Sequence, residues 1–260
     1  MAITAGIDAG AKNTKAVILR DGEVIGRGTT PTGFEQEEAV EKALAMALEA
    51  AGIDRDQVDR IVGTGAGRSN VPPAHDSVTE VTADARGAIS LYPSVRTVID
   101  VGAEEGRGIS VDGEGKVVDF AINEKCAAGA GAFTEAMARA LEIPLESIGE
   151  LSLKSTKHID MNAQCTVFAE SELVSLVHAN TATADIARAV HDAIASRITS
   201  MVRRVGLNPD VCLVGGVGHN VGFKKSLQED LGMEVTVPDH PEYVTALGAA
   251  IRAREQLGGD

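Results

Sequence analysis

Two segments of the sequence carry an aspartate and glycines in a spacing that can hold phosphate groups. The first, IDAGAKNTKAVILRDGEVIG, starts at Ile7, and the second, IDVGAEEGRGISVDGEGKVVDF, starts at Ile99. Each reads Ile-Asp-x-Gly-Ala, then an apolar strand, an Asp-Gly turn and a second strand. Glycine lets backbone N–H groups surround an anion, and a strand-end aspartate can hold Mg²⁺ through water. The duplicated turn therefore predicts a nucleotide site.

The expected nucleotide site draws on three strand ends. Asp8 and Asp100 are the candidate catalytic residues, and Lys15 is expected to neutralise phosphate charge. The third strand end, in LVGGVGHN, is expected to meet the nucleoside. The expected nucleotide-binding residues are Gly10, Lys12, Lys15, Gly102, Gly215, Gly216 and Gly218. No G-x-x-x-x-G-K-[ST] motif occurs, so the site is not a Walker-type loop.

Two of the three cysteines stand where a thiolate can bind metal. Cys126, in NEKCAAGAGAF, and Cys165, in CTVFAESELVSL, each precede a helical pattern, and helix N-termini stabilise thiolates. Cys212 lies in the apolar strand VCLV and is expected to be a buried small side chain. Two thiolates are half of what a four-iron cluster usually takes, and a dimer with one cluster on its axis would supply the rest.

Strands alternate with helices along the chain, which indicates an α/β fold with helices covering the sheets. A helix with Val40, Leu44 and Leu48 on one face is expected to end at Gly52. A longer helix, with apolar residues at four-residue spacing, is expected to end at Gly206. We expect an N-terminal domain over 1–94 and a C-terminal domain over 95–242 that carries the cysteines. The last helix, 243–260, is expected to pack on the first domain.

Composition excludes several classes of partner. The formal net charge of −14 argues against nucleic acid and anionic membranes, because both require a basic surface. No stretch approaches the length of a membrane span, and MAITAGIDAG lacks the features of a signal peptide. These features lead us to expect a cytoplasmic protein, in which three cysteines are not a disulfide framework.

The duplicated turns and the Gly-Gly turn resemble those of the actin, sugar-kinase and Hsp70 ATPase superfamily. This resemblance covers nearly the whole chain and implies two duplicated domains with ATP in the cleft between them. Closure of the cleft would then be coupled to hydrolysis.

NEKCAAGAGAF and CTVFAESELVSL, with TGAGR, GGVGHN and TALGAA, resemble the ATP-dependent activators of benzoyl-CoA reductases and 2-hydroxyacyl-CoA dehydratases, the BadF/BadG/BcrA/BcrD-type ATPases. The resemblance implies a dimer in which Cys126 and Cys165 of each subunit hold one 4Fe–4S cluster. It also implies ATP/ADP with Mg²⁺, a ferredoxin as electron donor, and acyl-CoA reductase or dehydratase subunits as electron acceptor.

The phosphate turns depart from the family pattern. Ala11-Lys12 stands where Ser/Thr-Thr is common, and Ala103-Glu104-Glu105 replaces Gly-Gln-Asp. These changes favour the shorter, non-identical activator subunit of a benzoyl-CoA reductase over a homodimeric dehydratase activator. Glu104 is the candidate for orienting water, with Glu105 as the alternative. Two other functions remain open: a small-molecule kinase of the same fold, and a nucleotide-binding subunit that holds half a cluster without hydrolysing ATP.

Overall fold

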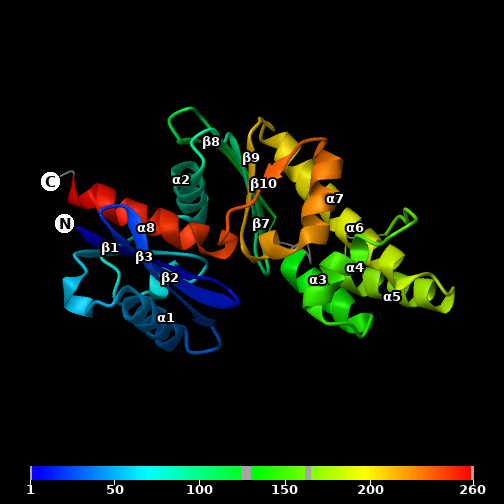
Figure 1. The fold of residues 1–260 in the computed structure, drawn as a ribbon, viewed down its shortest axis with the longest axis horizontal. Coiled ribbons are helices and arrows are strands. Elements are labelled where there is room, and N and C mark those ends of the chain that lie inside the picture. The colour runs from blue at the N-terminus through cyan, green and yellow to red at the C-terminus, as the bar shows by residue number, and fades with distance from the viewer. Residues whose placement is uncertain (1, 124–129, 162–164, 259–260) are drawn as a thin grey trace. The chain divides into compact units, whose positions relative to one another are not determined.

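The computed structural model describes residues 2–123, 130–161 and 165–258, and the chain divides into two compact units (Figure 1). Unit 1 comprises Met1–Ser94, Asp112–Val117 and Glu242–Asp260, and unit 2 comprises Val95–Val111 and Val118–Pro241. None of the helices in the described residues combines the length and the apolar character needed to cross a bilayer.

Unit 1 is built on a five-stranded sheet with the order β3-β2-β1-β4-β5. Strand β1 pairs antiparallel with β2 and parallel with β4, so a meander is extended by parallel strands. The strands are β1 (Ile3–Ala9), β2 (Asn13–Arg20), β3 (Glu23–Pro31), β4 (Arg60–Thr64) and β5 (Asp76–Ser77).

Helices cover both faces of the unit 1 sheet. Consecutive residues of β2 point to opposite faces: Ile18 packs in a core with α1 (Gln36–Ala51), and Leu19 packs in a core with α8 (Val244–Leu257). Helix α2 (Glu80–Leu91) packs against α8. In Figure 1, α8, in red, lies beside the blue strands of the N-terminus.

Strand β1 and helix α8 approach each other backbone to backbone. A Cβ atom on Gly6 would collide with the backbone of Ala246 and Ala250. The hydroxyl of Thr4 donates a hydrogen bond of 3.1 Å to the carbonyl of Ala250. The first strand of the chain is therefore in direct contact with the last helix.

Unit 2 repeats the strand arrangement of unit 1, with the order β10-β9-β6-β7-β8. Strand β6 pairs antiparallel with β7 and parallel with β9, as β1 does with β2 and β4. The strands are β6 (Thr97–Val101), β7 (Gly106–Val111), β8 (Val117–Asn123), β9 (Val211–Val214) and β10 (Val235–Thr236). The duplication expected from the two Ile-Asp-x-Gly-Ala segments is thus present in the topology.

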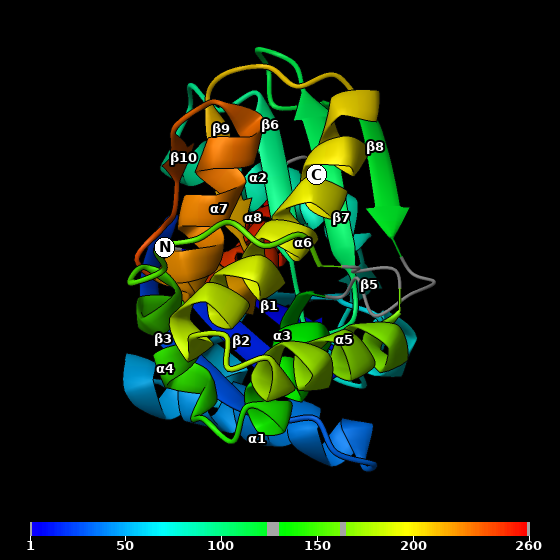
Figure 2. The same ribbon diagram turned by 90° about the vertical axis from the view of Figure 1, so that its right-hand side faces the viewer.

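In unit 2, α6 and α7 pack on each other and on the strands of this second sheet (Figure 2). The largest core of the protein joins them through buried residues such as Phe133, Ile194 and Phe223. The helices are α3 (Ala130–Ala140), α4 (Leu145–Ser152), α5 (Thr166–His178), α6 (Thr183–Arg204) and α7 (Val221–Leu231). Single 3₁₀ turns occur at Arg55–Gln57, Arg68–Asn70, Gly216–His219 and Pro241–Tyr243.

The helix ends and the second hairpin agree with the sequence patterns. Helix α1 ends at Gly52 in the left-handed conformation, with φ 64°. Strands β7 and β8 are neighbours joined at the Asp112-Gly113 segment, as predicted, but the connection is longer than a two-residue turn, and its left-handed residue is Gly115, with φ 78°. The carboxylate of Asp112 stabilises this loop by accepting N–H bonds from Glu114 and Lys116.

A buried histidine joins α6 to α7. The Asn220 side chain caps α7 by accepting from the N–H of Phe223, and its amide N–H donates to Nε2 of His191 over 3.0 Å. His191 is therefore neutral with its proton on Nδ1, which has no partner among the described residues. Burial lowers the pKa of His191 to about 4 from the usual 6.5.

Stability should fall as the pH drops from about 6.5 towards 4. In that window the unfolded chain binds a proton at His191 and the folded chain does not, which is worth about 3 kcal/mol at the lower end. The His191→Gln variant keeps an acceptor for Asn220 and should lose this part of the pH dependence. Urea unfolding of both proteins between pH 4 and 7.5 measures the free energy of unfolding. If this free energy changed with pH to the same extent in both proteins, the prediction would be contradicted.

Candidate nucleotide site and cysteine segments

The first phosphate turn is organised by an ion pair across a hairpin. Asp8 at the end of β1 lies directly opposite Lys15 on β2, and their side chains are 2.9 Å apart. The carboxylate is buried, whereas the Lys15 side chain is 18% exposed. Gly65, which follows β4, has φ 94°, and a Cβ there would press against Asp8 Oδ1 and the carbonyl of Ala9. A glycine is therefore required beside the carboxylate.

The second phosphate turn has the same plan with a stronger clamp. Asp100 on β6 lies opposite Arg107 on β7, and the guanidinium binds both Asp100 and Glu105. The Arg107 side chain is only 6% exposed. Gly215, after β9, occupies the place that Gly65 has in unit 1: its φ is 84°, and a Cβ there would meet Asp100 Oδ1. A planar guanidinium can hold two carboxylates at once, which an ammonium does less rigidly.

The glycine turn expected to meet the nucleoside lies next to the second phosphate turn. Gly215 contacts Asp100 and Val101, its N–H donates to the carbonyl of Pro241, and Gly218 is buried against Pro241. A Cβ on Gly216 would meet nothing within 4 Å, so the backbone there faces open space. Exposed backbone beside a buried carboxylate is suited to a polar ligand.

The expected nucleotide residues fall into one group for each unit. Asp8, Gly10 and Lys15 lie together in unit 1, since a Cβ on Gly10 would be 3.3 Å from Lys15 Nζ. In unit 2, Asp100 and Gly102 belong to one turn, and Gly215 contacts Asp100. Lys12 and Glu104 are exposed at the tips of their turns.

Sequence reasoning missed Arg107 and Gly65. Arg107 follows Asp100 by the same seven residues that separate Lys15 from Asp8. Gly65 follows the parallel neighbour of β1, as Gly215 follows that of β6. A residue-by-residue alignment of the two repeated segments contains the signal for Arg107, whereas Gly65 lies outside these segments, directly after the strand RIVGT.

The structure describes two of the three cysteines. Cys165 is the half-buried residue that immediately precedes α5, and its thiol is free. Cys212 is fully buried in β9, and this burial raises the pKa of its thiol to about 12, so it is an inert core residue. Cys126 lies outside the described residues, four positions before the first residue of α3.

The chain segments that lead to both cysteine positions line one cavity in unit 2. The cavity has a volume of about 1330 Å³, and its wall includes Ile122 and Asn123 from the end of β8 and residues 158–161. The first pair precedes Cys126, and the second segment precedes Cys165. The two segments are therefore neighbours in space.

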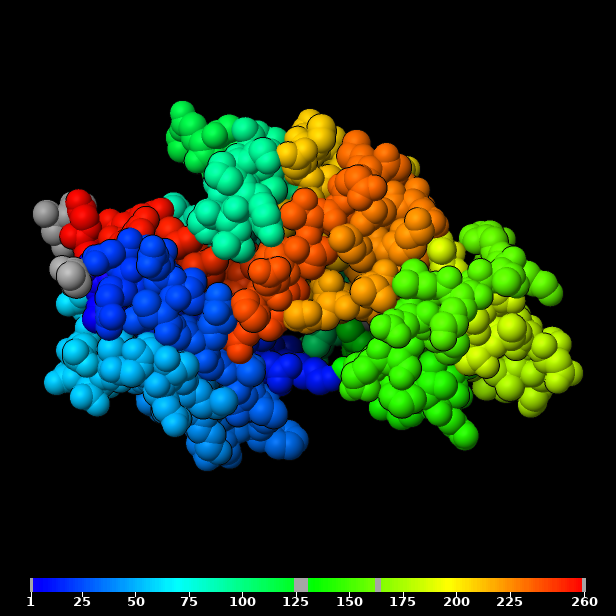
Figure 3. Space-filling view, viewed as in Figure 1, coloured from blue at the N-terminus to red at the C-terminus, as the bar shows by residue number. Residues whose placement is uncertain are grey.

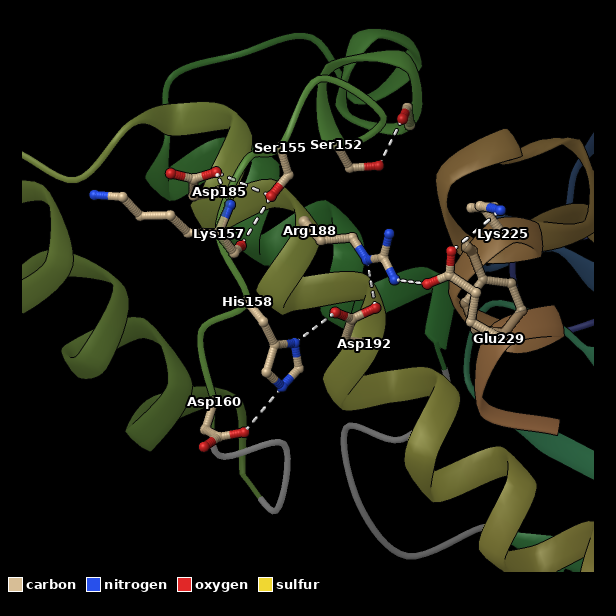
Figure 4. A network of polar contacts seen from close by, with 12 residues as sticks. Ser152, Ser155, Lys157, His158, Asp160, Asp185, Arg188, Asp192, Lys225 and Glu229 are labelled. Atoms are coloured by element: carbon tan, nitrogen blue, oxygen red, sulfur yellow. Dashed lines mark hydrogen bonds and ion pairs between the residues drawn. The ribbon is translucent and has the colours of Figure 1, made fainter. Parts of the chain in front are cut away.

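A network of charged residues fixes the segment before Cys165 to α6 and α7 (Figure 4). Asp185 accepts bonds from the Ser155 hydroxyl and from the N–H groups of Thr156 and Lys157. These bonds, that of Thr156 first, hold the pKa of Asp185 below its usual value. His158 contacts Asp192 at 3.4 Å.

The network continues from α6 to α7. Arg188 donates to Asp192 over 2.6 Å and also pairs with Glu229 of α7. Because α7 follows the Gly215–Gly218 turn, this network connects the nucleoside turn with the segment before Cys165.

Helix α5 has an apolar side that is exposed. Its buried residues are Ala169 and Leu173, whereas Val167 and Phe168, next to Cys165, are each 66% exposed. Val174 and Val177 are exposed as well, so this side of the helix does not face the core. Figure 3 shows α5, in yellow-green, at the surface. Exposed apolar groups that cluster in this way are typical of protein contact surfaces.

The thiol chemistry fits an iron–sulfur group only in part within the described residues. Those residues contain no cluster of three or more His, Cys, Asp or Glu side chains that could hold a metal. Cys165 is a free thiol at a helix N-terminus, which is a suitable iron ligand. The ligand set therefore needs donors beyond the described part of this chain.

The sequence profile of the BadF/BadG/BcrA/BcrD ATPase family matches residues 5–253. The chain is 38% identical to the activator of lactoyl-CoA dehydratase of Anaerotignum propionicum, over 97% of each protein. It is 34% identical to the 2-hydroxyisocaproyl-CoA dehydratase activator of Clostridioides difficile, over 97% of this chain and 95% of that protein. It is 33% identical to a benzoyl-CoA reductase subunit of Thauera aromatica, over 96% and 93%.

Solved structures agree with the sequence matches. Component A of (R)-2-hydroxyglutaryl-CoA dehydratase from Acidaminococcus fermentans superposes with a TM-score of 0.95 at 35% identity, over 99% of this chain and 100% of that one. The Clostridium difficile 2-hydroxyisocaproyl-CoA dehydratase activator with bound ADPNP gives 0.92 at 33%, over 98% and 96%. A ROK family glucokinase from Streptomyces griseus gives 0.60 at 16%, over 98% and 100%, a likeness of fold alone. The fold is that of the actin, sugar-kinase and Hsp70 ATPases, as the sequence predicted.

Removing Arg107 should destabilise the protein more than removing Lys15. Arg107→Gln leaves the buried Asp100 carboxylate without its counter-charge, which typically costs roughly 3–5 kcal/mol. Lys15→Gln should cost less, because Lys15 is more exposed. Arg107→Lys keeps the charge and should fall between the wild type and Arg107→Gln. Urea unfolding midpoints measure this order, and equal losses at the two positions would contradict it.

Proposed function

The chain belongs to the BadF/BadG/BcrA/BcrD ATPase family, and on this premise we propose that it is the ATP-dependent activator of a 2-hydroxyacyl-CoA dehydratase. In this role it hydrolyses ATP and delivers an electron to the dehydratase. The electron comes from a ferredoxin-type donor.

The two phosphate turns are proposed to bind the phosphates of ATP. Asp8 and Asp100 supply carboxylate oxygens, the ligands that Mg²⁺ prefers, either directly or through water. Lys15 and Arg107 already balance these carboxylates. Glu105 is engaged by Arg107, so Glu104, exposed at the tip of the turn, is the better candidate for orienting the attacking water. Gly215, Gly216 and Gly218 are proposed to meet the nucleoside.

Cys126 and Cys165 are proposed to hold one edge of a 4Fe–4S cluster, with the same pair from a second chain completing it. When bound, such a cluster supplies a one-electron redox centre. The exposed apolar residues Val167 and Phe168 beside Cys165 support a second chain at this surface. Ala169 and Leu173 anchor α5 in the core and so fix the helix that begins after Cys165.

One observation favours an activator over a kinase of the same fold. The segments before Cys126 and Cys165 line one cavity, although they are far apart in the sequence. A shared cluster needs two cysteine-bearing segments near one place, whereas a sugar kinase has no use for this arrangement. This convergence carries the proposal.

The named relatives favour one of the two kinds of activator. The phosphate-turn substitutions favoured the shorter benzoyl-CoA reductase subunit, but most of the named relatives are dehydratase activators. The Thauera aromatica benzoyl-CoA reductase chain is similar to a comparable degree. The homodimeric dehydratase activator, the alternative that the sequence left open, is therefore the better-supported function, and a benzoyl-CoA reductase component is the second candidate.

Replacing Asp8 by Asn should lower ATP hydrolysis while leaving the fold intact. The change removes the charge that would hold Mg²⁺ but keeps the shape and one oxygen of the side chain. Steady-state ATPase activity of the iron-loaded protein, together with its urea unfolding midpoint, measures both effects. Activity equal to wild type would refute the assignment of Asp8.

Replacing Cys126 or Cys165 by Ser should abolish the iron–sulfur absorbance and electron spin resonance signal. Cys212→Ala is the matched control: it should keep the cluster and loosen the core by roughly 1 kcal/mol. The test is iron content and mass of the anaerobically purified protein. A homodimer with four irons per two chains supports the dehydratase activator.

The remaining outcomes separate the alternatives. Iron that binds only with a related second chain would favour the benzoyl-CoA reductase type. A wild type without iron that transfers phosphate to a small molecule would establish the kinase. Iron binding without single-turnover ATP hydrolysis would indicate a nucleotide-binding protein that does not use ATP as fuel.

A further inference from the structure

The two phosphate turns differ in what holds their carbonyl groups. In unit 1 the holder is Thr32, just after β3: its hydroxyl donates to the carbonyl of Gly10 over 2.7 Å, and its N–H donates to that of Lys12 over 2.9 Å. Thr32 is buried, and its hydroxyl also contacts that of Thr14. The first turn is thus tied to the end of its own meander.

In unit 2 a helix holds the carbonyl of Gly102, which corresponds to Gly10, and that of the next residue, Ala103. The N–H of Gly131 donates to the carbonyl of Gly102 over 3.2 Å, and the N–H of Ala132 donates to that of Ala103 over 2.9 Å. Both donors belong to the first turn of α3, where helix N–H groups have no partner within the helix. The phosphate turn therefore satisfies the N-terminus of α3, and neither can shift alone without losing these bonds.

Gly131 permits this contact. A Cβ at position 131 would lie 2.9 Å from Ala103 Cα and 2.9 Å from the carbonyl oxygen of Gly102. Both are backbone atoms, so no side-chain rotation relieves the clash. Any larger residue must push the helix and the turn apart.

The geometry points to Gly131 as a positioning residue that transmits the nucleotide state of the second phosphate turn to α3, the helix that follows Cys126. This inference rests on the proposed function. A ligand that moves the Gly102–Ala103 backbone moves the two acceptors of α3, and the helix follows because its N-terminal bonds follow. Cys126 lies four residues before Ala130 in the sequence. In the described part of unit 1, Thr32 takes the place of these helix bonds.

Amide hydrogen exchange of the full-length protein tests the link without relying on activity. In wild type, adding ADP or a non-hydrolysable ATP analogue should change the exchange rate of peptides from the first turn of α3. In Gly131→Ala this turn should exchange faster, by about tenfold, with or without nucleotide, because its two N-terminal bonds are weakened. Nucleotide is added at a concentration that saturates each protein. Arg139→Ala, an exposed change on the same helix, should behave as wild type.

A second readout uses the iron-loaded protein. Nucleotide should alter the electron spin resonance signal of wild type and of Arg139→Ala, but not that of Gly131→Ala with the same iron content. A wild type that binds nucleotide with no change in α3 exchange would overturn the inference even if Gly131→Ala fails to fold. So would a nucleotide response in Gly131→Ala equal to that of wild type. A wild type that binds no nucleotide would instead overturn the proposed function.

Discussion

A buried carboxylate at the end of a central strand is the constraint around which each unit is organised. Asp8 and Asp100 are both nearly inaccessible to solvent, and an unpaired charge in such a place is strongly unfavourable. The strand that follows must therefore place a cation opposite the carboxylate, and it does so with Lys15 and Arg107. The parallel strands β4 and β9 end beside the carboxylates, and there is no room for a side chain at the next residue. Gly65 and Gly215 occupy these positions in the left-handed region. In each unit the hairpin register places the cation opposite the carboxylate, and the glycine leaves room beside it.

The two copies of this arrangement differ in stiffness. Lys15 is a partly exposed point charge that can be drawn towards a ligand, whereas Arg107 is buried in a fork between Asp100 and Glu105. The N-terminus of α3 also holds the carbonyl groups of the second turn, and the Gly215–Gly218 turn lies against Asp100. A rigid turn in contact with helices is suited to transmitting a displacement, and an adaptable one is suited to meeting a charged ligand.

Much of the fold could be predicted from the sequence because its signals are local. The repeated Ile-Asp-x-Gly-Ala and the four-residue spacing of Ile186, Val190 and Ile194 identify the duplication and α6 directly. The sequence says less where tertiary context decides. Asp112-Gly113 has the composition of a tight hairpin, but the Asp112 carboxylate stabilises a longer loop. In α5 the pattern could not distinguish a core face from a contact face, because apolar residues occur on both. The candidate site was identified from strand-end residues, whereas Arg107 was missed because a strand arginine has no signature outside the alignment of the repeats.

The contact between β1 and α8 determines the order in which the protein can become complete. A ribosome releases the chain from the N-terminus, and β1, the middle strand of the unit 1 sheet, is among its first residues. The helix that covers Val17, Leu19 and Val62 is among its last. All of unit 2 is synthesised between β1 and α8. Unit 1 therefore begins to be synthesised first, but its sheet is covered on both faces only after unit 2 has been made. Throughout that interval an apolar face of the unit 1 sheet lacks its cover, and an exposed apolar face of this kind favours association with other chains.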